Sequence, residues 1–319
     1  MTEEQWDLAF PLADDIYTYD NFLKAVAKFP ALCNETNLKD SSNQAWTVED
    51  TCKRELASIF AHWTQETGAR NANEGEYWTQ ALYYVQEIRC NQGHVDPTCD
   101  DKSSNWSAKI WPPASGKQYY GRGPFQLTWN YNYGQFSNVF APSSYNSKEY
   151  LLENPEYLQT NGDLAMAASI WFYMTPQTPK PSMHDVMTGF FEPNAADTTA
   201  KLGANFGTTI NIINGYDECG KASTLADRRG EYYLKWLHYF ELPAEGDLGC
   251  AEQPTTFPKG GAGNVPGYWE QSWAWPHVTE CRLVDYMTGY SVAARDDYKR
   301  CICDKYGDGE QSCPQATSD

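Results

Sequence analysis

A glutamate at the end of an apolar helix face is the first candidate for chemistry in this sequence. Glu66 follows Trp63 by three residues and Ile59 by seven, which places it on the face that they share. A carboxylate that packs against aromatic surface is held back from ionising, so a glutamate in such a place can donate a proton near neutral pH. The alternative, an exposed glutamate in a last helical turn, is the commoner situation in an arbitrary sequence.

The helix that must position Glu66 has local start and stop signals. Thr47 and Asp50 have the spacing of a capping box, which predicts a helix that starts here and runs to about Thr67. Gly68 is expected to end it. Apolar residues recur at helical spacing along this segment, namely Cys52, Leu56, Ile59, Phe60 and Trp63.

Two further segments favour buried helices. Asp20 can cap a helix that ends before Pro30, with Phe22, Val26 and Phe29 facing inward. The longest apolar run, from Leu164 to Met174, is too short to cross a bilayer and predicts a buried helix.

A helix near the end of the main domain carries a second charged candidate. It is predicted to start at about Ser223, and Arg228 lies on the first turn of its apolar face. A buried arginine needs an acidic partner, and Glu218 is available ten residues earlier. The face itself consists of Leu225, Tyr232, Tyr233, Trp236 and Phe240.

The composition narrows the class of ligand. The 319 residues carry a net charge of −18, which argues against nucleic acid or an anionic membrane as a partner and favours a neutral or cationic ligand. With 12 Trp, 22 Tyr and 13 Phe, the chain is rich in rings that stack on sugars. A core that is simply rich in tryptophan is the alternative.

Ten cysteines and two glycosylation sequons indicate a secreted, extracellular protein. The sequons begin at Asn34 and Asn105, and both sequons and disulfides belong to an oxidising route. Zinc is the competing explanation, but the chain has five His and no pair of Cys-x-x-Cys motifs. Two local bridges are possible, Cys33 with Cys52 and Cys90 with Cys99.

The composition shifts at about Thr255, so we expect a main domain over residues 1–254 and an extension over 255–319. The four cysteines of the extension suggest two disulfides that stabilise a segment too small to form its own hydrophobic core. Trp269, Trp273 and Trp275 either bind sugar or pack the extension onto the main domain. The four cysteines are Cys281, Cys301, Cys303 and Cys313.

The segment KQYYGRGPFQLTWNYNYG is dense in Gly, Asn and aromatic residues. Its core, Gly121 to Pro124, predicts a tight turn, and the composition is typical of a binding surface or a β-rich lobe. A phosphate-binding loop is excluded, because neither a lysine nor a helix start follows at the required place.

Several segments together resemble the plant-type endochitinases of glycoside hydrolase family 19. The resemblance runs from about Tyr17 to Cys250, in the family's order, through YTYDNFLKAVAKFP, KRELASIFAHWTQET, QYYGRGPFQLTWNYNYG, IWFYMTPQTPKPSMHDV, NIINGYDECG and ADRRGEYY. It implies a mainly α, two-lobed, lysozyme-like catalytic domain with a cleft between the lobes, to which the small Cys- and Trp-rich extension is added. It implies no metal and no cofactor.

The resemblance also implies roles for individual residues. Glu66 matches the family's catalytic acid, although Gln65 stands where the family has His, and Glu87 matches the general base. Thr128 matches the hydroxyl residue that holds the attacking water. Glu218 and Arg228 match an ion pair that supports the base. The positions that line the family's sugar cleft are Gln126, Tyr131, Asn132, Gln177, Lys180 and Asn214.

The expected activity is therefore endo-acting hydrolysis of β-1,4-N-acetylglucosamine linkages in chitin, with inversion at the anomeric carbon. The expected partners are chitin or chito-oligosaccharides, with no nucleic acid and no membrane, and a monomer is expected. Two alternatives stay open: a catalytically inactive chitin-binding or defence protein, and a muramidase that acts on peptidoglycan.

Overall fold

Helices dominate the structure, a computed structural model that describes residues 1–29, 31–40, 42–90, 111–140, 150–177, 179–263, 268–269 and 283–284. The short strands β1 (Tyr268–Trp269) and β2 (Leu283–Val284) pair antiparallel. Two 3-10 helices are η1 (Tyr77–Thr79) and η2 (Ile88–Cys90). The α-helices are α1 (Glu3–Ala9), α2 (Tyr19–Val26), α3 (Val48–Thr67), α4 (Asn130–Phe140), α5 (Tyr150–Glu153), α6 (Tyr157–Thr160), α7 (Gly162–Met174), α8 (Met183–Thr188), α9 (Ala195–Thr199), α10 (Phe206–Glu218) and α11 (Thr224–Tyr239).

The predicted limits of α3 are confirmed. Thr47 Oγ1 accepts a hydrogen bond from the Asp50 amide at 3.0 Å, and Gly68 follows the last helical residue. Glycine is needed at position 68 because a Cβ there would lie 2.5 Å from the Thr64 carbonyl oxygen. The chain therefore turns away immediately after the turn that carries Glu66.

The helix expected near Asp20 exists, but the predicted cap is wrong. Thr18 caps α2, because its backbone is extended and its Oγ1 accepts from the Asn21 amide. Asp20 already lies within the first helical turn, and its carboxylate pairs with Lys24 one turn later at 2.6 Å.

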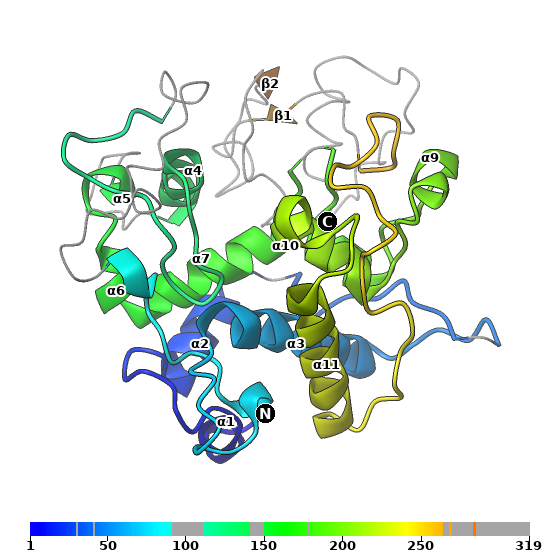
Figure 1. Ribbon diagram of the computed structural model, residues 1–319, viewed down its shortest axis with the longest axis horizontal. Coiled ribbons are helices and arrows are strands. Elements are labelled where there is room, and N and C mark those ends of the chain that lie inside the picture. The colour runs from blue at the N-terminus through cyan, green and yellow to red at the C-terminus, as the bar shows by residue number, and fades with distance from the viewer. Residues whose placement is uncertain are drawn as a thin grey trace, which may run out of the picture.

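An aromatic cluster fixes α3 within the core. Phe60 and Trp63 of α3 are fully buried, and Trp236 of α11 packs on Phe60 with 5.1 Å between ring centroids. Trp6 of α1 also packs on Trp63, with 6.4 Å between the ring centroids. The long helix that carries Glu66 in its last turn is therefore held along α11 by large, rigid side chains (Figure 1).

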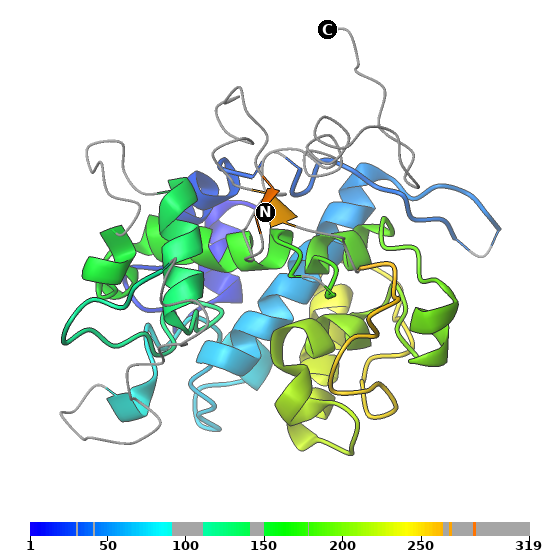
Figure 2. The same cartoon turned by 90° about the horizontal axis from the view of Figure 1, so that it is seen from above.

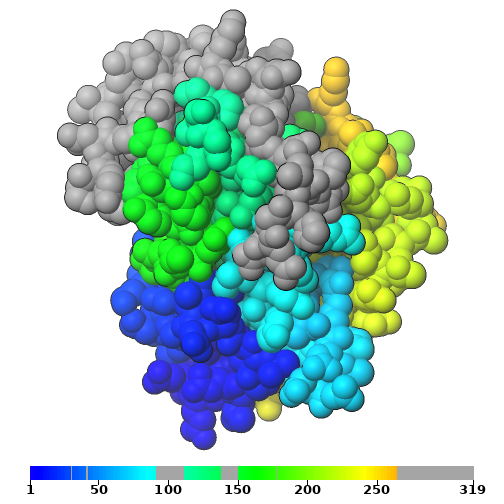
Figure 3. Space-filling view, turned by 60° about the vertical axis from the view of Figure 1, so that its left-hand side comes forward, coloured from blue at the N-terminus to red at the C-terminus, as the bar shows by residue number. Residues whose placement is uncertain are grey.

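The helices form two groups with α3 and α7 between them. Helices α4, α5 and α6 lie on one side and α9, α10 and α11 on the other in both views (Figures 1 and 2). Figure 3 shows the green segments around α5 and the yellow-green segments around α10 and α11 on opposite sides of the molecule. The mainly helical content and the two groups of helices agree with the predicted fold class.

The predicted bridge between Cys33 and Cys52 is confirmed. A second disulfide joins Cys219 to Cys250 and was not predicted; it ties the end of α10 to the segment after α11. Cys99, and with it the proposed bridge to Cys90, lies outside the described residues.

The expected domain boundary at Thr255 falls within a segment that packs on the main domain. The Pro254 carbonyl accepts from Asn211 Nδ2 at 2.8 Å, and the Ala262 amide donates to Asp197 Oδ2 at 2.7 Å. Phe257 is buried. The tail cysteines, Trp273 and Trp275 lie outside the described residues, and only the backbone of Trp269 is described.

None of the helices in the described part of the chain is both long and apolar enough to cross a membrane.

A buried histidine joins α8 to α3. His184 contacts Glu55 through Nδ1 at 2.5 Å and Glu35 through Nε2 at 2.7 Å. Burial alone lowers the pKa of His184, but the two carboxylates outweigh it and raise the pKa to about 10. The histidine is therefore a cation that bridges two acids at neutral pH.

The protein should lose stability as His184 loses its proton. Its pKa rises from about 6.5 in the unfolded chain to about 10 on folding, so this contribution is fully present below pH 6.5 and lost as the pH rises towards 10. The expected loss in the free energy of unfolding over this pH range is on the order of 4–5 kcal/mol. Denaturant titrations from pH 6 to 9.5 should show a shallower decline for His184→Gln. Equal slopes for the two proteins would contradict the assignment.

Candidate active site

A cavity of about 720 Å³ gathers nine of the predicted site residues. Its walls come from the end of α3, the segments 84–89 and 125–132, Phe172 of α7, residues 177 and 180, and the last turns of α10. These elements are far apart in the sequence, so only folding brings them together. The nine residues are Glu66, Glu87, Gln126, Thr128, Tyr131, Asn132, Gln177, Lys180 and Asn214.

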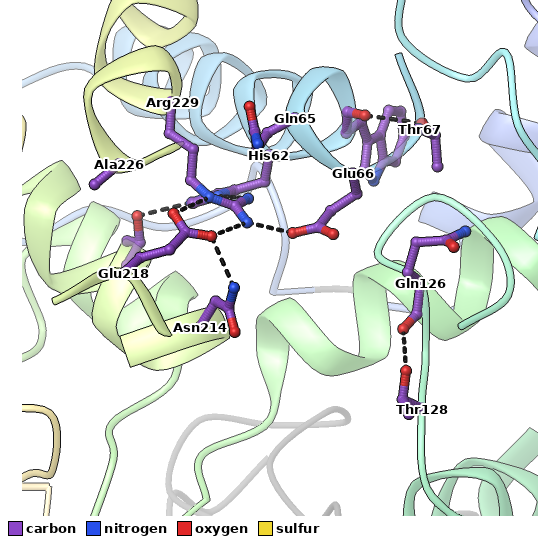
Figure 4. Close-up of polar contacts among 12 residues, drawn as sticks. His62, Gln65, Glu66, Thr67, Gln126, Thr128, Asn214, Glu218, Ala226 and Arg229 are labelled. Atoms are coloured by element: carbon purple, nitrogen blue, oxygen red, sulfur yellow. Dashed lines mark hydrogen bonds and ion pairs between the residues drawn. The ribbon is translucent and has the colours of Figure 1, made fainter. Parts of the chain in front are cut away.

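Glu66 has a cationic neighbour that the sequence did not reveal. Its Oε1 accepts a hydrogen bond from Arg229 Nη2, where aromatic surface was expected to be the main influence. The Glu66 side chain is 21% exposed, and within the described residues no hydrogen bond to Oε2 is seen. Figure 4 shows this carboxylate directed towards Arg229, with Gln126 and Thr128 on the other side of the Glu66 side chain.

The predicted ion pair is wrong in two respects: the arginine is Arg229 and not Arg228, and within the described residues it contacts Glu66 and not Glu87. Arg228 is exposed, whereas Arg229 is buried and forms two bonds to Glu218, from Nε at 2.9 Å and from Nη2 at 2.8 Å. Asn214 Nδ2 donates to the same carboxylate at 2.8 Å. The error has a geometric cause, because the predicted apolar face of α11 is rotated from the buried one. The buried face includes Ala226, Arg229, Tyr233 and Trp236. Leu225, which the sequence places on the apolar face, is 37% exposed.

Charge compensation keeps this network together. Burial disfavours the charged form of Arg229, but Glu66 and Glu218 outweigh it, so the pKa of the guanidinium is raised. Arg229 therefore forms ion pairs with two carboxylates. Glu218 is almost fully buried, whereas Glu66 is partly exposed and lines the cavity.

His62, one helical turn before Glu66, completes the network and was missed by the sequence analysis. Arg229 Nη1 can only donate, so His62 Nδ1 accepts its hydrogen bond at 3.1 Å and Nε2 carries the proton. Nε2 then donates to Thr209 Oγ1 at 2.9 Å. Burial, together with the charge of Arg229, lowers the pKa of His62 well below 6.5. A neutral imidazole thus orients the guanidinium.

The second carboxylate is held by pairing between two loops. The Glu87 amide donates to the Gly121 carbonyl at 2.9 Å, and the Gly123 amide donates to the Val85 carbonyl at 2.9 Å. Between these two glycines, Arg122 places its guanidinium 3.7 Å from the centre of the Tyr120 ring. Glu87 is therefore anchored to the same loop that carries Thr128.

Thr128 lies between two residues in an unusual backbone conformation. Gln126 and Trp129 have φ values of 49° and 78°, which are strained for side-chain-bearing residues and typical of functional sites. Thr128 Oγ1 donates to the Gln126 carbonyl at 2.8 Å, and Asn132 Nδ2 donates to the Thr128 carbonyl at 2.8 Å. With its proton engaged, the Thr128 hydroxyl presents an acceptor.

Lys180 and the aromatic rings give the cavity a mixed lining. Lys180 Nζ donates to the Ile212 carbonyl at 2.8 Å, and burial lowers the pKa of this amine to about 8. Burial also raises the pKa of Tyr131.

Trp129 lies nearly parallel to Tyr131, is 38% exposed and lines the cavity, so it offers a ring to a sugar. Trp129 belongs to the aromatic segment noted in the sequence but was not among the predicted site residues.

In the described part of the chain, no group of three or more His, Cys, Asp or Glu side chains is arranged to hold a metal ion.

Comparisons with known proteins agree with one another. A family model described as Chitinase class I matches residues 4–250. Endochitinase CH25 of Brassica napus is 36% identical over 259 residues, which cover 79% of this chain and 70% of the relative. Inactive chitinase-like protein 1 of Hevea brasiliensis is 35% identical over 258 residues, covering 79% and 72%. A solved bacterial family 19 chitinase aligns with a TM-score of 0.54 and 26% identity, covering 78% of this chain and 98% of that one.

Proposed function

This chain belongs to glycoside hydrolase family 19, described as Chitinase class I, and we propose that it hydrolyses the β-1,4 linkages of chitin at internal positions, with inversion. The observation that carries the proposal is that Glu66 and Glu87, from separate segments, line one cavity together with Thr128. Two carboxylates on either side of a glycosidic bond are the minimum machinery of a glycosidase.

Glu66 is assigned as the acid. Arg229 binds its Oε1, so Oε2 is the oxygen that would carry the proton to the departing sugar oxygen. Glu218 accepts two hydrogen bonds from the guanidinium of Arg229. The negative charge of Glu218 therefore offsets part of the positive charge that Arg229 exerts on Glu66. His62 and Glu218 act as positioning residues, because they fix Arg229 and do not line the cavity.

Glu87 is assigned as the base that acts on water. A water between Glu87 and Thr128 can donate one hydrogen to the carboxylate and the other to Thr128 Oγ1, whose own proton is held by the Gln126 carbonyl. A lone pair on the oxygen of this water then points at the anomeric carbon of the sugar. This mechanism needs a gap of roughly 6.5–9.5 Å between the two carboxyl groups, wide enough for the water.

An inactive chitin-binding protein is the second candidate, because one of the relatives is named an inactive chitinase-like protein. This chain has both carboxylates and the Thr128 hydroxyl in one cavity, which supports hydrolysis over mere binding.

Parallel assays on chitin oligomers and bacterial cell walls should separate the candidates. We expect the purified chain to hydrolyse the oligomers, with the Glu66→Gln, Glu87→Gln double variant as the control for contaminating enzymes. Oligomer binding without hydrolysis would favour the inactive protein, and hydrolysis of cell walls alone would favour a muramidase.

We also propose that the protein is secreted and acts as a monomer. The Cys33–Cys52 and Cys219–Cys250 disulfides suit an oxidising compartment, and Asn34 of the first sequon is exposed. One chain supplies every side chain assigned above.

A further inference from the structure

The last turn of α10 sends three successive side chains in different directions. Asn214, with φ −146° and ψ 35°, breaks the helical conformation within α10, and Tyr216, Asp217 and Glu218 follow it. Glu218 is 1% exposed and binds Arg229, Asp217 lines the cavity, and Tyr216, which precedes Asp217 in the chain, is 80% exposed. The kink therefore adds a carboxylate to the cavity and places an aromatic ring at the neighbouring position.

Asp217 differs from Glu66 in its neighbours. Glu66 is paired with Arg229, whereas no Lys, Arg or His side chain within the described residues forms a salt bridge with Asp217. Among the described residues, the cations that line the cavity are Lys180, which is directed to the Ile212 carbonyl, and Arg89, which is exposed. Within the described part of the chain, the negative charge that Asp217 contributes to the cavity is therefore not paired with a cation.

A carboxylate of this kind discriminates between the two forms of an amino sugar. An N-acetylated unit offers a neutral amide N–H, whereas a deacetylated unit offers an ammonium, whose charge-assisted hydrogen bond to a carboxylate is about twice as strong. An exposed tyrosine beside it can add stacking on the sugar and a cation–π contact. The net charge of −18 also attracts a cationic polymer to the molecule.

We propose that Asp217, with Tyr216 beside it, makes partly deacetylated chitin a preferred substrate by binding the ammonium of a glucosamine unit in the cleft. This inference rests on the proposed glycosidase function and names the form of the polymer that the site selects.

The test compares two substrates in the full chain: a fully acetylated chitin hexamer and a partly deacetylated oligomer of the same length. In the parent, kcat/KM should be higher for the deacetylated oligomer, and the preference should fall with added salt. Asp217→Asn should reduce the ratio of the two kcat/KM values by about tenfold. Tyr216→Ala should reduce it less. The matched control is Asp7→Asn, which removes one charge from an exposed position on α1 and should leave the ratio unchanged.

A ratio that is the same in Asp217→Asn and the parent would overturn the proposal. So would an equal fall in Asp7→Asn, since the effect would then come from net charge alone. If the parent hydrolyses neither oligomer, the proposed function fails, and calorimetric binding of the two oligomers tests Asp217 by itself. Tighter binding of the deacetylated oligomer by the parent but not by Asp217→Asn would support the assignment, and equal binding would reject it.

Discussion

Glu66→Gln and Glu87→Gln should each remove most of the hydrolysis of chitin oligomers, with losses in kcat of about 10²–10⁴-fold. Both changes keep the shape of the side chain and remove the ability to give or take the proton. We expect the larger loss for Glu66→Gln, because without the acid the departing sugar oxygen must leave as an alkoxide. Initial rates on a chitin hexamer measure both losses.

The matched control is Glu252→Gln, an exposed glutamate outside the cavity, which should retain the parent's activity. NMR of the newly formed reducing end should show the α-anomer first in the parent. Release of the β-anomer first would mean retention, and Glu87 would then not be a base acting on water.

Arg229→Ala should lower the free energy of unfolding by about 3–5 kcal/mol and also lower the rate. The change leaves Glu218 as a buried carboxylate without a cation, and Glu66 loses the group that holds its Oε1. The neighbouring Arg228 provides the control: Arg228→Ala removes the same charge from an exposed position and should change stability by no more than about 0.5 kcal/mol. Denaturant unfolding measures both.

A double variant separates the structural role of Arg229 from its role in the site. Glu218→Gln with Arg229→Met removes both buried charges, so it should recover part of the stability that Arg229→Ala loses. Activity should remain low, because nothing then orients Glu66. If Arg229→Ala proved as stable and active as Arg228→Ala, the assigned network would have no function.

Features set by local interactions were accessible from the sequence. The limits of α3 follow from a threonine that caps one end and a glycine that ends the other. The start of α11 at Ser223 and the burial of α7 were likewise predicted, since capping and an unbroken apolar run depend on near neighbours. The lysozyme-like fold and the members of the cavity came from the resemblance of whole segments, because no local rule states which distant loops meet.

The tertiary structure decided which of several similar residues lies in the site. Successive side chains on a helix point about 100° apart, so the rotation of α11 against α3 buries Arg229 and exposes Arg228. After the kink at Asn214, Glu218 points to Arg229 and Asp217 lines the cavity. His62 became part of the site only because α11 brought a guanidinium to it. The sequence by itself determined the helices and the carboxylates that they carry, whereas packing between distant elements determined the charge that each carboxylate faces.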